Sequence, residues 1–271
     1  MKYLGAVIQA RTGSTRLPNK VLREIAGKPL LQHMLERVRA GKTLDRAIVA
    51  TTTRTEDDPI QALCEKLKVP YTRGEEEDVL GRYYQAAVEH NLGHIVRLTA
   101  DCPLLDPGVI DLVVRRYLEL QPNIDYVSNI MTHTFPNGME VEIMGFDCLA
   151  RAHKEAKRKY QREHVTPYIR ENLGRFRCKN VAHSEDLSHH RWTVDREEDL
   201  ELVRRIIEAL YPHKKLFLME DILAHLKEHP ELVALNNHIA RNEGFARSLE
   251  RENMPEEEKK RVARAILKKS V

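Results

Sequence analysis

Short apolar runs alternate with amphipathic segments over the first 120 residues of the chain. Apolar runs at 3–9, 46–51 and 94–99 predict buried strands, with a shorter extended piece at 69–72. Between the runs, apolar residues recur at helical spacing, and Asp or Pro stands where several helices would begin. This β-α-β-α order is typical of a mostly parallel sheet with helices on both faces. The predicted helices are at 28–40, 59–67, 78–91 and 106–120.

The pattern becomes looser between residues 124 and 195, where short strands and two helices are expected, before a clear helix over 196–210. From about residue 245 the chain is rich in Glu, Lys and Arg. It could be a terminal helix docked on a partner, but charge runs usually face water, which favours a solvated extension. The short strands are predicted at 125–128, 140–144, 176–181 and 191–194, and the two helices at 147–157 and 161–172. We therefore expect a domain over 1–243, with 124–195 as a distinct subregion, and a charged helical extension over 244–271.

Composition narrows the class of protein. The chain has 271 residues, of which 42% are hydrophobic, enough for a sizeable core. Its 44 basic and 41 acidic residues are interspersed and give a net charge of +3, which does not indicate a nucleic-acid binder. The four cysteines lack C-x-x-C spacing, so they indicate reduced thiols rather than a zinc site. No signal peptide or bilayer-spanning stretch is recognisable, so we expect a cytoplasmic protein without membrane insertion.

The first strand leads directly into a loop of small and basic residues. Small residues let backbone N–H groups approach phosphate oxygens, and arginine and lysine side chains supply positive charge. The loop has neither the G-x-x-x-x-G-K-[ST] nor the G-x-G-x-x-G pattern. It predicts a polyphosphate site, the alternative being a basic surface turn that binds nothing. Its key residues are Ala10, Arg11, Gly13, Ser14, Arg16 and Lys20.

Strand 94–99 ends in Thr99, Ala100 and Asp101, at the same edge of the predicted sheet as the loop. Mg²⁺ prefers one or two carboxylates together with phosphate oxygens and water, so Asp101 is a candidate metal ligand. On position alone, an aspartate that caps a turn is the simpler interpretation.

The pattern A-R-x-G-S-x-R-L-P-x-K, followed by Gly27-Lys28-Pro29-Leu30, resembles the signature of sugar nucleotidyltransferases. It is most similar to the CMP-sugar synthetases, which are related to acylneuraminate cytidylyltransferases, and among them to cytidylyltransferases of the spore-coat polysaccharide biosynthesis protein F type. The resemblance implies a Rossmann-like three-layer α/β/α nucleotide-diphospho-sugar transferase fold with a mostly parallel mixed sheet. It implies Mg²⁺-dependent transfer of CMP from CTP to an acidic, nonulosonic-acid-like sugar, with release of pyrophosphate, in surface polysaccharide or glycan biosynthesis. By analogy, it also implies a homodimer.

The resemblance also implies roles for individual residues. Asp101 stands in the D-x-P-L setting of the family's metal aspartate, and Asp195 matches a second metal carboxylate just before a helix. Simple capping of helix 196–210 is the alternative for Asp195. Arg11, Arg16 and Lys20 would act with Asp101 in catalysis. The expected nucleotide contacts are Ala10, Arg11, Gly13, Ser14, Arg16, Lys20, Arg73, Gly74, Arg82, Thr99 and Ala100.

Two further segments resemble family regions. Residues 73–82 match a segment that contacts base and ribose in related enzymes, the alternative being an acidic loop that caps a helix through Asp78. In the 124–195 subregion, Asn137, Glu140, Glu142 and His164 are candidate contacts to the acceptor sugar. The alternatives there are an Asn-Gly turn with a solvent-facing strand edge, and a packing or helix-capping role for His164.

Two other functions remain open at this stage. One is a glycosyltransferase of the same architecture, a class that usually shows a D-x-D metal motif; Asp101-Cys102-Pro103 lacks the second acid. The other is a non-catalytic nucleotide- or sugar-binding module. The joint presence of Asp101 and Asp195 argues against such a module, because binding alone does not require metal carboxylates.

Overall fold

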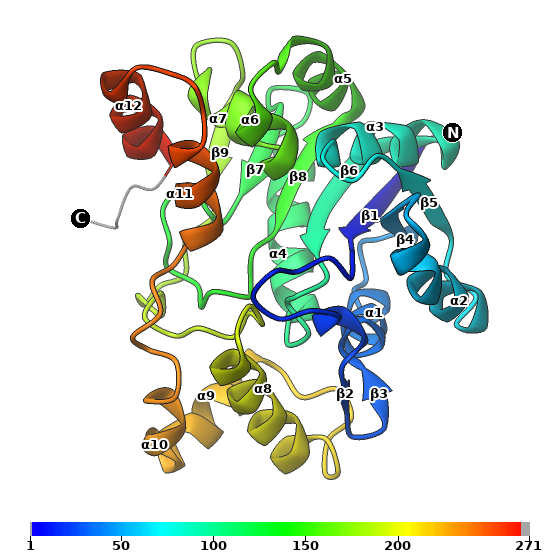
Figure 1. Ribbon diagram of the computed structural model, residues 1–271, viewed down its shortest axis with the longest axis vertical. Helices are drawn as coiled ribbons and strands as arrows, with labels where there is room; N and C mark the ends of the chain where they lie inside the picture. Colours follow the sequence, from blue (N-terminus) through cyan, green and yellow to red (C-terminus); the bar gives the residue numbers. More distant parts are fainter. Residues whose placement is uncertain (1, 267–271) are drawn as a thin grey trace.

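A computed structural model describes residues 2–266 of the chain (Figure 1). The last five residues of the predicted extension, 267–271, lie outside the described residues. A seven-stranded sheet crosses the molecule; its strands are β1 (Tyr3–Gln9), β4 (Arg46–Thr52), β5 (Tyr71–Gly74), β6 (Leu92–Thr99), β7 (Tyr126–Ser128), β8 (Glu142–Gly145) and β9 (Cys178–Asn180). The strand order is β5-β4-β1-β6-β8-β7-β9, and only β8 runs antiparallel to its neighbours. The predicted mostly parallel mixed sheet is confirmed.

Helices cover both faces of the sheet and give three layers. On one face lie α1 (Leu30–Arg39), α2 (Asp58–Lys66), α4 (Pro107–Glu119), α8 (Glu197–Leu210) and α9 (Met219–Glu228). On the other face lie α3 (Val79–Glu89), α5 (Phe146–Glu155) and α7 (Pro167–Glu171). Each face of the sheet packs against its helices in a hydrophobic core. Side chains along a strand point alternately to opposite faces, so Ala6 and Ile8 of β1 lie in the first core and Val7 lies in the second.

The remaining elements surround this sandwich. They are the hairpin β2 (Glu24–Ile25) and β3 (Lys28–Pro29), the short helices η1 (Lys20–Leu22) and η2 (Thr55–Asp57), and the helices α6 (Lys159–His164), α10 (Pro230–Val233), α11 (Glu243–Glu250) and α12 (Glu256–Ile266). Within residues 2–266, no helix is both long and apolar enough to cross a membrane.

Two predicted elements differ from the structure. The helix expected over 161–172 is divided into α6 and α7, because Val165 has φ 72° and Pro167, which lacks an N–H group, begins the second helix. The segment expected as a strand at 191–194 pairs with loops instead. The backbone N–H of Trp192 donates to Asn137 O at 2.6 Å, and that of Val194 donates to Asp101 O at 2.8 Å.

The described part of the charged extension is helical and packed, which differs from the solvated tail that its charge runs favoured. Its apolar residues form a small core with Tyr160 of α6, while the charged residues lie on the other faces of the helices. Figure 1 shows α11 and α12 beside α6 and α7. The core residues of the extension are Phe245, Leu249, Met254, Val262 and Ile266. The domain boundary at residue 243 stays a prediction.

Candidate active site

The carboxyl ends of β1 and β6 border a cavity of about 450 Å³. Gln9 and Thr99 are partners in the parallel register, so the loop after β1 and the segment containing Asp101 leave the sheet side by side. Most of the residues predicted for the site line this cavity, although they come from distant parts of the chain. They are Ala10, Arg11, Gly13, Ser14, Arg16, Lys20, Arg82, Thr99, Ala100, Asp101, Asn137, Glu140, Glu142, His164 and Asp195.

Lys20 joins the two predicted metal carboxylates. Its buried ammonium donates to Asp101 Oδ2, Asp195 Oδ1 and the backbone oxygen of Val194, each at 2.8 Å. Burial alone would lower the pKa of Lys20, but the two carboxylates outweigh burial and raise the pKa above its ordinary value. Lys20 is therefore a fixed positive charge between Asp101 and Asp195.

Asp195 is surrounded by cations. Besides Lys20, Arg16 Nη2 lies 2.9 Å from Asp195 Oδ1, and Arg191 Nη2 lies 3.3 Å from Oδ2. Burial would raise the pKa of Asp195, but Lys20 and then Arg16 hold it well below its usual range. Asp195 is thus ionised at every pH at which an enzyme would ordinarily work.

The capping role considered for Asp195 belongs to Asp199 instead. The fully buried Asp199 accepts hydrogen bonds from the backbone N–H groups of Asp195 and Arg196, at 2.9 and 3.1 Å, and so caps α8. It also accepts a bidentate pair from Arg191, at 2.8 and 2.9 Å. This network fixes the backbone at Asp195 and leaves its carboxylate pointing to the cations.

The geometry of Asp101 and Asp195 fits a shared divalent cation. An oxygen from each lies 2.8 Å from the Lys20 ammonium, so the two carboxylates converge on one place, and a metal ion bound there would replace that ammonium. Residues 2–266 contain no group of three or more His, Cys, Asp or Glu side chains that could form a complete metal cage. Two carboxylates that need phosphate oxygens and water to complete the shell match the preference of Mg²⁺.

A buried aspartate that the sequence did not reveal as a site residue holds the loop of small and basic residues after β1, residues 10–20. We call this loop the candidate phosphate loop. Asp57, in η2, accepts hydrogen bonds from both the backbone N–H and the hydroxyl of Thr12 at 2.7 Å, and also from the hydroxyl of Thr52. Thr12 O in turn accepts from the backbone N–H groups of Ser14 and Asn19. The loop is therefore preorganised from the β4 side, and Asp57 is the residue that positions it.

The structure brings Arg82 to the cavity but not Arg73 or Gly74. The Arg73 guanidinium is bonded to Thr52 O and Arg54 O, at 2.7 Å each, at the end of β4. A Cβ on Gly74 would lie 2.9 Å from Arg82 Cγ, so this glycine makes room for Arg82. Arg82 donates to the backbone oxygen of Glu76 at 2.8 Å, which holds the loop that borders the nucleotide side.

Glu142, a candidate contact to the acceptor sugar, is fully buried and positions another residue. One of its carboxylate oxygens pairs with Arg97 and the other accepts from the hydroxyl of Tyr126. Burial would lower the pKa of Arg97, but Glu142 raises it. Arg97 also donates to Gln9 at 3.2 Å, and both line the cavity. The signal for Arg97 was present in the sequence, as a charged residue within an otherwise apolar strand.

Asn137 and His164 meet the cavity from opposite segments of the subregion. Asn137 belongs to a tight turn: Gly138 has φ 106°, and a Cβ there would lie 2.8 Å from the backbone nitrogen of Thr193.

His164 shares a hydrogen bond of 3.0 Å with the hydroxyl of Ser248, and burial lowers the His164 pKa to about 4. His164 is therefore neutral at pH 7 and can accept or donate a hydrogen bond without carrying charge. Glu140 accepts from the backbone N–H of Gly138 at 2.7 Å and pairs with Arg241.

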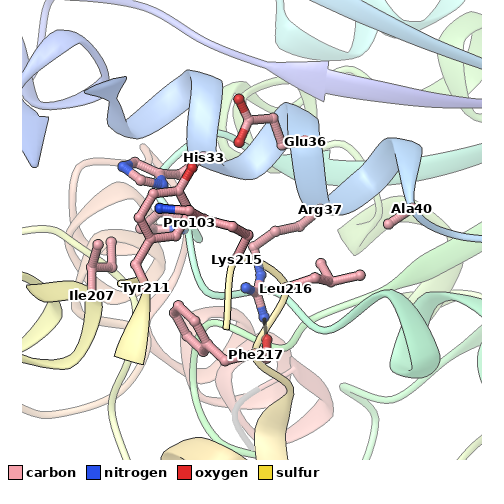
Figure 2. A pocket seen from close by; sticks show the side chains of 10 residues that line it. All are labelled: His33, Glu36, Arg37, Ala40, Pro103, Ile207, Tyr211, Lys215, Leu216 and Phe217. Carbon is pink, nitrogen blue, oxygen red and sulfur yellow. Dashed lines mark hydrogen bonds between the residues drawn. The ribbon is translucent and has the colours of Figure 1, made fainter. Parts of the chain in front are cut away.

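A smaller cavity of about 170 Å³ lies between α1 and the segment after α8 (Figure 2). Its arginine, Arg37, donates to Leu105 O at 2.9 Å and to Phe217 O at 2.6 Å, and burial lowers its pKa to about 10. Its histidine, His33, is bonded to Ile25 O at 2.8 Å. Because both side chains are already bonded to backbone oxygens of neighbouring segments, they hold these segments together, and we interpret the cavity as part of the packing between them.

Comparison with known proteins matches this geometry to one family. A family model described as cytidylyltransferase matches residues 6–239. An uncharacterized protein of Methanocaldococcus jannaschii is 41% identical over 243 residues, which are 88% of this chain and 96% of that protein. The spore coat polysaccharide biosynthesis protein SpsF of Bacillus subtilis is 32% identical over 74% of this chain and 85% of that protein. A 3-deoxy-manno-octulosonate cytidylyltransferase of Trichlorobacter lovleyi is 35% identical over 42% of this chain and 44% of that protein.

A solved structure agrees with these relatives. A cytidylyltransferase from Leptospira borgpetersenii superposes with a TM-score of 0.82 at 34% identity, covering 86% of this chain and 97% of that one. The family model begins within β1 and ends beyond α10, so it includes the loop after β1 and every later strand of the seven-stranded sheet. The chain belongs to the cytidylyltransferase family.

Proposed function

We propose that this protein transfers CMP from CTP to a hydroxyl of an acidic sugar, with Mg²⁺, and releases pyrophosphate. The observation that carries the proposal is the convergence of Lys20, Asp101 and Asp195 beside a preorganised loop of small and basic residues. Relatives named for 3-deoxy-manno-octulosonate and for spore coat polysaccharide support an acidic sugar and a role in surface polysaccharide or glycan biosynthesis.

The nucleotide half of the proposed site is the loop together with the ends of β1 and β6. The backbone N–H group of Gly13 and the hydroxyl of Ser14, with the side chains of Arg11, Arg16 and Lys20, would bind the triphosphate and stabilise the leaving pyrophosphate. Ala10, Arg82, Thr99 and Ala100 line the same part of the cavity and would border the nucleoside. Arg73 and Gly74 are left out of this half because neither residue lines the cavity.

Asp101 and Asp195 are the residues that would hold Mg²⁺. The bound ion supplies charge neutralisation at the reacting phosphate and a lower pKa for the attacking hydroxyl. The protein's own contribution is position: Asp199 fixes the backbone of Asp195, and Asp57 fixes the loop. Phosphoryl-type transfer depends mainly on such positioning and on charge neutralisation.

The acceptor half is bordered by Asn137, Glu140 and His164, with Arg97 held in place by Glu142. A fixed guanidinium on this side suits an acceptor that carries a carboxylate. The expected homodimer is part of the same proposal and is tested by sedimentation of the purified chain.

The test is pyrophosphate release with CTP, UTP, ATP or GTP, Mg²⁺, and a panel of acidic and neutral sugars. We expect release with CTP and an acidic sugar, and none when Mg²⁺ is chelated. Release with another nucleotide, or with neutral sugars alone, would contradict the proposal. Preferential binding of an intact nucleotide sugar would favour a glycosyltransferase instead.

A further inference from the structure

The C-terminal extension forms one wall of the acceptor half of the cavity. Residues 242–245 and 247–248 line the cavity, as do Arg251 and Ile266. The family model ends at residue 239, so this wall is made by a part of the chain that the model does not include. Its polar contacts include Glu163 and His164, and His164 is a candidate contact to the acceptor sugar.

The wall is firmly attached to the rest of the protein. Both carboxylate oxygens of Glu243, at the start of α11, accept from Arg196 Nη2, at 2.9 and 2.7 Å. Ser248 donates to Glu163 at 2.8 Å and shares a hydrogen bond with His164 at 3.0 Å. At the far end, Arg170 donates to the backbone oxygen of Ile266 at 2.8 Å. With the apolar core around Phe245, these bonds place α11 in a defined position against the cavity.

The charges on this wall are not balanced. Its acid, Glu243, is already neutralised by Arg196. Within residues 2–266, the one ion pair of Arg247 is a long contact of 3.6 Å to Glu243, and 47% of its side chain is exposed. Arg251 is exposed at the edge of the cavity and makes no ion pair within residues 2–266. Beneath them, the buried Arg170 also lines the cavity, and its Nε has no hydrogen-bond partner in the described part of the chain.

We infer that the extension recognises the carboxylate of the acceptor sugar through Arg247 and Arg251. A guanidinium binds a carboxylate through two parallel N–H donors, and neither of these two arginines is committed to a close acid. The triphosphate is provided for elsewhere, by the loop and by Lys20, so the ligand of this wall is the sugar acid. This inference rests on the proposed function and adds to it that residues 243–251 determine which acceptor is used.

The test compares the Arg247→Gln/Arg251→Gln double variant with an Arg261→Gln control. Arg261 lies on α12, is 79% exposed and does not line the cavity, so its loss removes one positive charge from the same extension without changing the cavity. Probes are CTP with Mg²⁺ and either 3-deoxy-manno-octulosonate or N-acetylneuraminate, each also as its methyl ester. Circular dichroism confirms that both variants are folded.

We expect the double variant to raise KM for the acidic sugar at least tenfold, with KM for CTP changed less than twofold. The control should match the wild type, and the ester should be as poor a substrate for the wild type as the acid is for the double variant. An unchanged KM for the acid, or an equal rise in KM for CTP, overturns the inference while the proposed function stands. A wild-type protein that binds CTP in calorimetry but neither binds nor uses these acids overturns the inference as well. If the wild type does not bind CTP in calorimetry, that result contradicts the proposed function itself.

Discussion

The Lys20 ammonium lies 2.8 Å from Asp195 Oδ1, although 175 positions separate the two residues in the chain. Lys20 opens η1 at the end of the candidate phosphate loop, and Asp195 stands just before α8. This contact therefore ties the loop to the far end of the fold. Because Lys20 also holds Asp101, the candidate metal carboxylates are already neutralised by a cation of the protein itself.

Replacing Lys20 with methionine keeps the apolar stem of the side chain and removes its charge. Asp101 and Asp195 then lose their shared partner, so we expect the free energy of unfolding to fall by about 3 kcal/mol. We expect the rate of pyrophosphate release to fall at least about 100-fold, because a charge aimed at the phosphates is lost. Urea denaturation and the pyrophosphate assay measure the two effects. Lys66→Met, on the exposed end of α2, is the matched control and should change neither.

The same variant tests whether Asp101 and Asp195 bind a metal. Without the ammonium, the cations that remain within residues 2–266, Arg16 and Arg191, pair with Asp195 and not with Asp101. Millimolar Mg²⁺ should therefore bridge the two carboxylates and raise the melting temperature of Lys20→Met more than that of the wild type. Equal responses of the two proteins to Mg²⁺ would contradict the assignment of these carboxylates as metal ligands.

Asp101→Ala removes one of the two carboxylates at the end of β6. We expect Mg²⁺-dependent turnover to fall at least about 100-fold while the fold is retained, since Lys20 keeps its bonds to Asp195 and to Val194 O. Pyrophosphate release over a Mg²⁺ titration gives the activity, and circular dichroism reports the fold. Asp147→Ala, on the exposed first turn of α5, should behave like the wild type. Turnover by Asp101→Ala at the wild-type rate would remove Asp101 from the proposed site.

The sequence predicted the site best where an apolar strand pattern ends directly in residues that can bind a phosphate or a metal ion. The apolar run of β1 ends directly in the basic loop, and β6 ends directly before Asp101, so parallel pairing alone predicted that the two segments meet. Asp195 was identified through the resemblance, as the position that matches a second metal carboxylate just before a helix. Its approach to Lys20 could not be derived from spacing, because the segment before it pairs with loops rather than with a strand.

Other site residues depend on contacts that no local pattern encodes. Asp57 looks like an ordinary helix-capping residue in the sequence, yet it holds Thr12 of the candidate phosphate loop. Glu142 was expected to contact the sugar, whereas its oxygens are used by Arg97 and Tyr126. The charge runs of the extension hid its apolar stripe, since the apolar residues are few and widely spaced. Such partners are determined by tertiary packing, which the pattern of a single chain does not show.

Asp199 is expected to be the most important acid for stability near the site. It is fully buried and accepts hydrogen bonds from the side chains of Arg191 and Asn236 and from two backbone N–H groups. Asp199→Ala should lower the free energy of unfolding by about 3–5 kcal/mol, because the buried Arg191 loses its bidentate partner and keeps only a longer contact of 3.3 Å to Asp195. Glu198→Ala, one position earlier and exposed, should change it by less than about 0.5 kcal/mol. Urea unfolding of both variants checks this, and similar losses in the two would contradict the buried role of Asp199.

His133 predicts a pH dependence of stability. Burial first, and then the nearby charge of Arg241, lower its pKa to about 3 in the folded protein, whereas an unfolded histidine titrates near 6.5. The unfolded chain therefore binds the additional proton between pH 6.5 and 3, so the contribution of His133 to stability is complete above pH 6.5 and is lost as the pH falls through this range.

Between pH 7 and pH 5, this one histidine should cost the wild type about 2 kcal/mol of unfolding free energy, since the unfolded form is protonated over 1.5 pH units while the folded form is not. His133→Gln keeps a polar side chain beside Asn242 and cannot titrate, so its loss over the same interval should be smaller by that amount. Urea unfolding of both proteins at pH 7 and pH 5 gives the difference, and the other histidines cancel because both proteins contain them. Parallel losses in the two proteins would mean that His133 is protonated in the folded state at pH 5, and that its burial against Arg241 does not lower its pKa as the structure indicates.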